Sequence, residues 1–438
     1  MRSDDRDAGA ARWPVRTSVA VAAVLAGAAL LGHRAAVAKT FEATLVKAEN
    51  RFRRRPAPDV VWETADPEVE GLSRAALDSL RTWLAAEGTE AFLVIRGNHV
   101  VCEWYRSWRG ANLRQGLGAM AKATTANVAL LAAATDGRIA FDDPARKYVP
   151  AWRGDPLRSR IRLADLAAHQ SGLATEDFGA PQGGWRQPYF EHPEQRFAIA
   201  LSRVPVVFPP GTRYNYAGAG YYVLAYALTT GLKKAPQHDI RTFLQERVMR
   251  PIGIPDADWQ LSYGESYRMD GMTLYAMGSG VEYTARAAAR IGQLILDFGR
   301  WGDRRLLDSA LVAWSLQPAT GQLPPDSGDY RRPPSTKGGG WSANSRASWP
   351  EAPRDAVAAM GSGHEIILVV PSLDLVMVRL GRALSPDAEF GPTARDHLFA
   401  PLMRAVIGPS SRMPKPGLRT AALRPTLPPG GWRSPPPP

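Results

Sequence analysis

The 438-residue sequence has very little cysteine and no clustered metal ligands. Cys102 is its only cysteine, so no disulfide can form within the chain. Its place in the apolar run Val100-Val101-Cys102 favours a buried thiol over a nucleophile. The seven histidines are scattered, and none belongs to a His-x-x-x-His helix face accompanied by carboxylates. These absences exclude a disulfide-stapled fold and give no support to a metal site, and we expect no cofactor.

The sequence also lacks a helix-turn-helix, zinc-finger or RNA-binding signature, although its formal net charge is +12. Much of the excess positive charge lies in short terminal clusters such as Arg51-Phe-Arg53-Arg54-Arg55. We therefore expect no nucleic acid as a partner. The charge instead predicts attraction to an anionic membrane or envelope surface.

The first 38 residues have the order of features of a secretory signal. Arg12 and Arg16 precede the apolar run from Val19 to Leu31, and Ala36-Val37-Ala38 follows it. A helix of this length is too short to span a hydrocarbon core of ~30 Å, so cleavage is preferred over a retained signal-anchor. We expect the protein to be exported to the periplasm or the extracellular space, with anchoring to the inner membrane as the alternative.

The composition limits how much of the chain is unstructured. Hydrophobic residues make up 45% of the sequence and charged residues 22%, which excludes disorder of the whole. Residues 39–69 are polar and arginine-rich and predict a linker or peripheral arm, whereas residues 70–408 predict one domain. Residues 409–438 form a proline-rich tail, which we expect to be disordered because proline lacks the N–H group that ladders and helices need.

Strand patterns occur near both ends of the expected domain, with helical patterns between them. Residues 92–105 predict a hairpin whose turn contains Gly97-Asn98, and residues 366–380 predict a second hairpin. Helices are expected from Leu72 onward and over residues 119–135, 220–230 and 284–298. The predicted fold class is α+β, with an antiparallel sheet formed from both sequence ends, helices on its faces and an inserted helical region.

The first candidate site lies at the start of the expected helix 119–135, where the sequence reads Ala119-Met-Ala-Lys122. A Ser-x-x-Lys at such a position is the nucleophile motif of penicillin-recognising enzymes. Residues three apart share a helix face, so the lysine amine reaches the hydroxyl, while the helix amino end offers N–H groups to an oxyanion. Here the lysine is present and the hydroxyl is not. Taken alone the motif says little, because alanine and lysine are common helix residues.

The residues that follow this helix carry a resemblance to a known family. They read, in order, Asp136-Gly-Arg-Ile139, Asp142-Asp143-Pro144, Tyr148-Val149-Pro150-Ala151-Trp152 and His169-Gln-Ser-Gly-Leu173. This series resembles the block after the catalytic helix in class C-like β-lactamases, D-alanyl-D-alanine peptidases and related esterases. The resemblance implies a β-lactamase/transpeptidase-like fold and acyl transfer or hydrolysis of amide or ester bonds. It also makes Ser171 part of a structural turn and not a displaced nucleophile.

Two further motifs of that family are altered. The Tyr-x-Asn loop aligns with Tyr216-Ala217-Gly218. The resemblance implies that Tyr216 is the general base, whereas Gly218 lacks the amide that orients lysine and substrate. The Lys/His-Thr-Gly triad falls on Ala359-Met360-Gly361, where Gly361 keeps the glycine and the other two residues are lost. His364 is a candidate substitute cation, although a turn histidine without a role is favoured.

The resemblance covers residues 70–405. It includes segments for which we expect no chemistry: Gly278-Ser-Gly280 to Arg286, residues 292–301, and Gly338-Gly-Gly-Trp341. Thr124 and Thr125 follow on the expected helix, off the face shared by residues 119 and 122, and are not expected to replace the lost hydroxyl. A buried lysine without a partner is costly, so Lys122 predicts either a lysine–tyrosine hydrogen bond or an exposed cleft.

The altered motifs leave four interpretations. The first is a pseudoenzyme whose remnant cleft binds a peptidoglycan-like peptide or a small acyl ligand. The second is an enzyme of another class that uses Lys122, Tyr216 or His364. The third is an active serine hydrolase with an engineered Ala119, and the fourth is a structural envelope domain without a surviving site. Loss of the nucleophile lowers turnover by about 10⁶ in a Ser-His-Asp hydrolase, and natural loss explains several altered motifs together.

Overall fold

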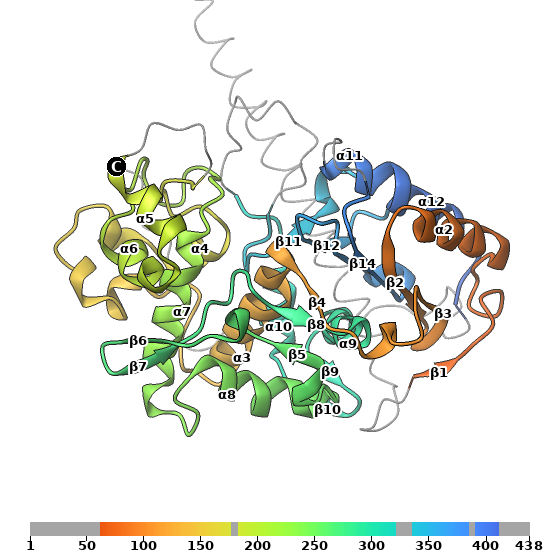
Figure 1. Ribbon diagram of the computed structural model, residues 1–438, viewed down its shortest axis with the longest axis horizontal. Helices are drawn as coiled ribbons and strands as arrows, with labels where there is room; N and C mark the ends of the chain where they lie inside the picture. The colour runs from red at the N-terminus through yellow and green to blue at the C-terminus, as the bar shows by residue number, and fades with distance from the viewer. Residues whose placement is uncertain (1–61, 177–182, 321–334, 385–389, 411–438) are drawn as a thin grey trace, which may run out of the picture.

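The computed structural model describes residues 62–176, 183–320, 335–384 and 390–410 (Figure 1). The expected export segment 1–38, most of the expected linker 39–69, and the expected tail beyond Ser410 lie outside these residues. In the described part of the chain, no helix is long and apolar enough to cross a membrane.

Strands and helices follow one another along the whole described chain. The strands are β1 (Glu63–Thr64), β2 (Thr89–Arg96), β3 (His99–Tyr105), β4 (Gln115–Gly116), β5 (Trp259–Gln260), β6 (Tyr267–Met269), β7 (Met272–Leu274), β8 (Glu282–Tyr283), β9 (Arg300–Trp301), β10 (Arg304–Arg305), β11 (Trp341–Ala343), β12 (Val357–Met360), β13 (Ile366–Val370) and β14 (Leu375–Gly381). The α-helices are α2 (Arg74–Ala86), α3 (Val128–Thr135), α4 (Leu163–Ala167), α5 (Arg186–Glu191), α6 (Arg196–Ser202), α7 (Ala219–Gly231), α8 (Ile240–Leu244), α9 (Ala285–Leu296), α10 (Ser309–Ser315), α11 (Phe390–Ala394) and α12 (Ala400–Arg404).

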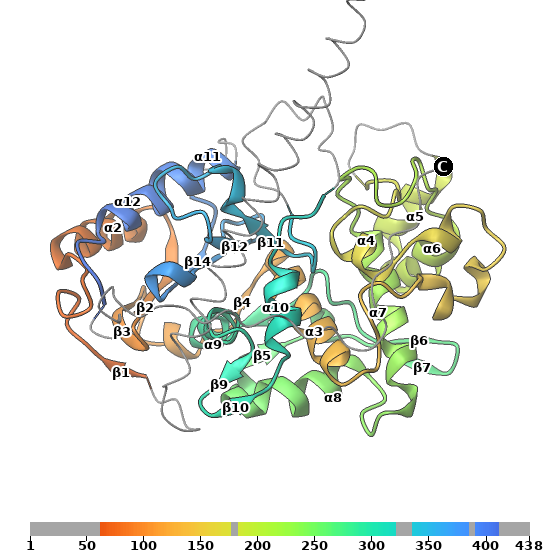
Figure 2. The same ribbon diagram turned by 180° about the vertical axis from the view of Figure 1, so that it is seen from behind.

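The main sheet is built from the two ends of the described chain (Figures 1 and 2). Its strand order is β1-β3-β2-β14-β13-β12-β11, so the first hairpin joins the last strands through the β2–β14 pair. Neighbouring strands run antiparallel, except that β1 runs parallel to β3. The predicted α+β class, with a sheet formed from both sequence ends, is confirmed.

Alternating side chains of the sheet enter two apolar cores. On β13, Ile367 and Val369 belong to one core, whereas Ile366, Leu368 and Val370 belong to the other. Successive side chains of a strand point to opposite faces, so a continuous β-branched run suits a sheet covered on both sides. Helices α2 and α12 cover one face, and α9 covers the other (Figures 1 and 2).

Local signals in the sequence explain how the first elements form. Gly97 and Asn98 have φ angles of +61° and +72°, as a two-residue type I′ turn requires. Helix α2 begins after Ser73, whose Oγ accepts the N–H of Ala76 at 3.3 Å. The folded region extends further toward the amino end than residue 70, because Trp62 is buried and β1 pairs with β3.

The inserted helical region lies beside the sheet, with α7 packed against α4 and α6 (Figure 1). The expected helix 119–135 is divided into a 3₁₀ turn at Gly118–Met120, a π-helical stretch at Lys122–Asn127, and α3. Apolar periodicity cannot separate the two hydrogen-bonding patterns over six residues, so the sequence predicted one uniform helix.

The end of this helix agrees with the prediction from Asp136-Gly137. Gly137 has a φ of +66°, and the N–H of Arg138 donates to the carbonyl oxygen of Ala133 at 2.9 Å. This pair of features is a Schellman motif, which glycine favours because it has no Cβ.

Candidate active site

Ala119 lies in the 3₁₀ turn that opens the first site segment, and it is partly exposed. The residue before it, Gly118, has a φ of +50°. A Cβ on Gly118 would lie 3.2 Å from the Ser362 hydroxyl oxygen, so the segments next to the first and third motifs lie close together. Ala119, which the sequence predicts at the nucleophile position, carries only a methyl group there.

Lys122 is buried, with 6% of its surface exposed, and its amine faces a specific set of partners. Nζ donates a hydrogen bond to the carbonyl oxygen of Gly278 at 2.8 Å. It lies 5.0 Å from the ring centroid of Tyr216 and 5.2 Å from that of Tyr221. Of the two alternatives predicted for Lys122, the exposed cleft does not apply, because the amine is held inside the protein by a backbone carbonyl and two aromatic rings.

Tyr216 is partly exposed and is supported by the turn of residues 169–173. The ring of His169 stacks on it with 4.4 Å between ring centroids, and Nδ1 of His169 accepts the N–H of Ala217 at 3.1 Å. Ser171 is 2% exposed, and its Oγ accepts the N–H of Leu173 at 3.3 Å. The geometry agrees with the interpretation of Ser171 as a turn residue.

Gly218 follows Tyr216 at the start of α7. Its N–H donates at 2.9 Å to Oε2 of Glu176, a residue that is 9% exposed. No pattern in the sequence pointed to Glu176, since a single acidic residue after a turn is not distinctive.

Gly361 follows β12 and packs against the chain leading to Ala119. A Cβ on Gly361 would come under 3.0 Å from the carbonyl oxygen of Leu117, so only glycine fits at this position. Close packing therefore explains by itself why the third motif retains its glycine.

His364 lies inside the turn after Gly361, and it is 2% exposed. Its Nδ1 accepts the N–H of Leu384 at 3.3 Å. The buried guanidinium of Arg379 donates to the carbonyl oxygens of Gly363 and His364 at 3.0 and 2.9 Å. This burial argues against His364 as a substitute cation in the site.

The glycine run before β11 lies directly on the lysine segment. A Cβ on Gly340 would come under 3.0 Å from the backbone of Lys122 and Ala123. Asn127 donates to the carbonyl oxygen of Gly338 at 3.0 Å and accepts from the indole of Trp341 at 3.3 Å. Residues 338–341, for which the sequence predicted no chemistry, thus fix the position of Lys122.

The other side chains that could act as nucleophiles are two hydroxyls and one thiol, and burial limits each of them. Thr124 and Thr125 are fully buried, with hydroxyls bonded to the Met120 carbonyl and to Tyr283. Burial raises the pKa of the Cys102 thiol to about 11, so the thiolate is scarce at neutral pH. Within the described ranges, no group of three or more His, Cys, Asp or Glu side chains is arranged to hold a metal ion.

Electrostatics set Lys122 apart from ordinary lysines. Burial lowers the pKa of its amine from 10.5 to about 8, and the nearby Glu176 carboxylate opposes this shift. Burial also raises the pKa of Glu176 above its ordinary value, against hydrogen bonds from backbone N–H groups. At neutral pH Lys122 is therefore mainly a cation, and it becomes neutral above about pH 8.

This shift predicts a pH-dependent stability. Below about pH 8 the Lys122 amine is protonated in both the folded and the unfolded protein. Between about pH 8 and 10.5 the unfolded chain still binds the proton, whereas the folded chain does not. The free energy of unfolding should therefore rise with pH, by about 1–2 kcal/mol between about pH 8 and 9.5. Urea unfolding should show this rise in the natural chain and in Lys147→Met, whose lysine is exposed, but not in Lys122→Met. Equal pH profiles for all three proteins would contradict the assignment.

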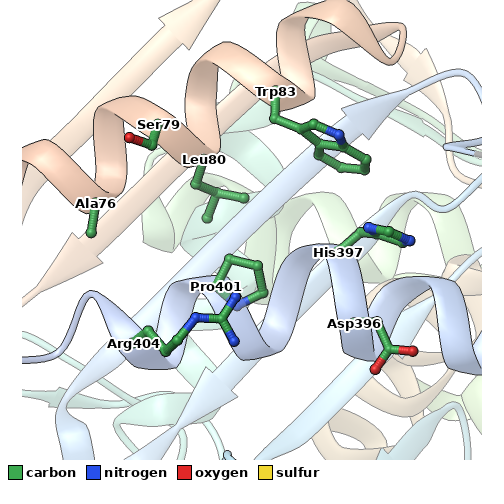
Figure 3. Close-up of a pocket in the computed structure, with 8 residues that line it drawn as sticks. All are labelled: Ala76, Ser79, Leu80, Trp83, Asp396, His397, Pro401 and Arg404. Atoms are coloured by element: carbon green, nitrogen blue, oxygen red, sulfur yellow. The ribbon is translucent and has the colours of Figure 1, made fainter.

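A groove of about 390 Å³ lies elsewhere, between α2 and residues 396–404 (Figure 3). Trp83 stacks on His397 across it, with 5.0 Å between ring centroids. Its walls contain none of the motif residues: they are Ala76, Ser79, Leu80, Trp83, Asp396, His397, Pro401 and Arg404. The groove is separate from the Lys122 site.

Comparison with known proteins decides the family. The model of the Beta-lactamase family matches residues 84–400, well over half of the chain. The chain belongs to the Beta-lactamase family.

Similar solved structures share the fold of this Beta-lactamase family member. A "putative beta-lactamase" from Bacteroides dorei is 18% identical, with a TM-score of 0.58, covering 76% of this chain and 99% of that one. A penicillin-binding protein homolog from Caulobacter crescentus is 14% identical, with a TM-score of 0.55, covering 76% and 99%. At these identities the likeness concerns the fold.

A curated relative of this family is the "Putative D-alanyl-D-alanine carboxypeptidase" of Escherichia coli K12. It is 21% identical over 221 residues, which are 44% of this chain and 49% of the relative. The chain thus spans about half the length of the curated relative it matches.

Proposed function

We propose that this Beta-lactamase family protein is catalytically inactive and binds a peptidoglycan-like peptide or a small acyl ligand at the remnant site. The observation that carries the proposal is the Lys122 amine, held by the Gly278 carbonyl, together with Ala119 three residues earlier, whose side chain is only a methyl group. A methyl group has no lone pair with which to attack a carbonyl, so no acyl-enzyme forms there. Ligand binding needs no nucleophile, and the partly exposed Tyr216 is a side chain that a ligand could contact.

The chemical class of the ligand follows from the relatives. Their names refer to D-alanyl-D-alanine and to penicillin, which supports a peptidoglycan-like peptide as the first ligand to test. The net charge of +12 supports association with an anionic envelope surface. We place the protein outside the cytoplasm on the secretory features of residues 1–38.

A second candidate is a structural envelope domain with no ligand. The 6% exposure of Lys122 favours it, because an amine with an internal acceptor has less capacity for a ligand. The two candidates differ in whether muropeptides bind.

The test combines covalent labelling with binding. The natural chain should remain unlabelled by a fluorescent penicillin and by a fluorophosphonate, yet muropeptides should bind in calorimetry. Tyr216→Ala should weaken this binding about tenfold, as the loss of one aromatic contact in a site does. Trp83→Ala removes an aromatic ring from the groove between α2 and residues 396–404, apart from the Lys122 site, and serves as the matched control.

Two results would contradict the proposal. Labelling of the natural chain would show that it is an active hydrolase. Absence of binding by every muropeptide would favour the structural candidate.

A further inference from the structure

Glu176 occupies the entrance to helix α7, next to the altered Tyr-x-Asn loop. Its Oε2 accepts the N–H of Gly218 at 2.9 Å, and its Oε1 accepts the N–H of Ala219. Burial and the nearby Glu176 carboxylate raise the pKa of the Tyr189 phenol. Helix α7 has 13 residues and an N-cap, Gly218, without a side chain, so Glu176 provides the carboxylate that a helix amino end favours.

The carboxylate also fills the space in front of Gly218. A Cβ on Gly218 would lie 3.2 Å from Oε1 of Glu176 and 3.6 Å from its Cδ. At the first distance the Glu176 carboxylate must shift slightly to admit a Cβ at position 218. A side chain at position 218 and the carboxylate at position 176 therefore crowd the same space.

Glu176 is the acidic group that acts on Lys122. The amine contacts the Gly278 carbonyl and the rings of Tyr216 and Tyr221, and the groups that influence its charge are Glu176 and Tyr263. Of these two groups Glu176 is the carboxylate, and after burial it has the larger effect, favouring the protonated amine. In this arrangement the proton on Lys122 is stabilised against burial.

We propose that Glu176 is a positioning residue that takes the place of the lost asparagine side chain, caps α7 and keeps Lys122 protonated. Lys122 is then mainly a fixed cation at neutral pH. The glycine at 218 and the glutamate at 176 form one coupled pair, so restoring the family's motif residues alone recovers only part of the activity. This inference is independent of which ligand the site binds.

The first test measures the charge on Lys122. The chain has eight lysines, so the [ε-¹³C]lysine signals can be followed by NMR, with Lys122 assigned through Lys122→Met. Glu176→Gln should lower the pKa of Lys122 by about one unit or more, as removal of a close opposite charge does. Glu191→Gln, on the exposed end of α5, should leave it unchanged. An unchanged pKa in Glu176→Gln would overturn the charge role.

The second test measures the steric coupling. Gly218→Asn should lower the melting temperature of the natural chain and have a clearly smaller effect in a Glu176→Ala background. The double-mutant cycle separates this coupling from the cost of each change. If the two changes are additive, the shared-volume role is overturned. If Glu176→Ala does not fold, the same cycle with Glu176→Ser decides the question, and the NMR test with Glu176→Gln is unaffected.

Discussion

The Gly340→Ala variant is expected to lose about 4 kcal/mol or more of its free energy of unfolding and to accumulate poorly as folded protein. A Cβ at this position would come under 3.0 Å from the backbone of Lys122 and Ala123, which are atoms of a buried helical segment and cannot rotate away. Since small domains are stable by about 5–15 kcal/mol, a loss of this size removes much of the total. Urea unfolding followed by circular dichroism measures the effect.

Gly271→Ala is the matched control for this substitution. Gly271 has a φ of +72°, close to the +77° of Gly340, but a Cβ on Gly271 would have no neighbour within 4 Å. Both variants place alanine in the left-handed region, which costs about 1–2 kcal/mol, and only Gly340→Ala adds the backbone overlap. Similar stabilities of the two variants would show that the glycine run does not press on the lysine segment.

The second large effect is expected from Ala119→Ser. Loss of the nucleophile lowers turnover by about 10⁶ in a Ser-His-Asp hydrolase, so recovery of only a thousandth of that activity raises labelling about 10³-fold above the natural chain. Recovery should be partial, because Lys122 donates to Gly278 and is mainly protonated at neutral pH. The rate of labelling should rise with pH through about 8, where the amine becomes neutral and able to accept a proton. Intact-mass spectrometry with a fluorophosphonate detects the adduct.

Controls for this prediction use the same helical segment. Ala134→Ser adds a hydroxyl near the end of α3, away from Lys122, and should remain unlabelled. Lys122→Met combined with Ala119→Ser should lose the adduct. Equal labelling of Ala119→Ser and Ala134→Ser would mean that the position after Gly118 no longer serves as a nucleophile position.

Several features of this protein were determined by the sequence. The β-branched runs and the Gly97-Asn98 turn predicted both hairpins, because alternation along a strand and left-handed turn residues act locally. The order of motifs from Asp136 to Leu173 predicted the Beta-lactamase family, which the family match confirms. The identity of Ala119 is read directly from the chain, and with it the absence of a hydroxyl.

Only the tertiary structure decided what surrounds these residues. Gly278 and Glu176 are 156 and 54 positions from Lys122 in the chain, and no local pattern relates a carbonyl or a lone carboxylate to an amine so far away in sequence. His364 was a candidate cation in the sequence, and its burial in the structure argues against that role. The need for glycine at residues 338–340 and 361 comes from backbone segments that pack against them. Hydrogen-bond partners, burial and close approach are properties of packing between distant segments. The sequence therefore determined the family and the alanine at position 119, and packing determined the charge and the contacts of Lys122.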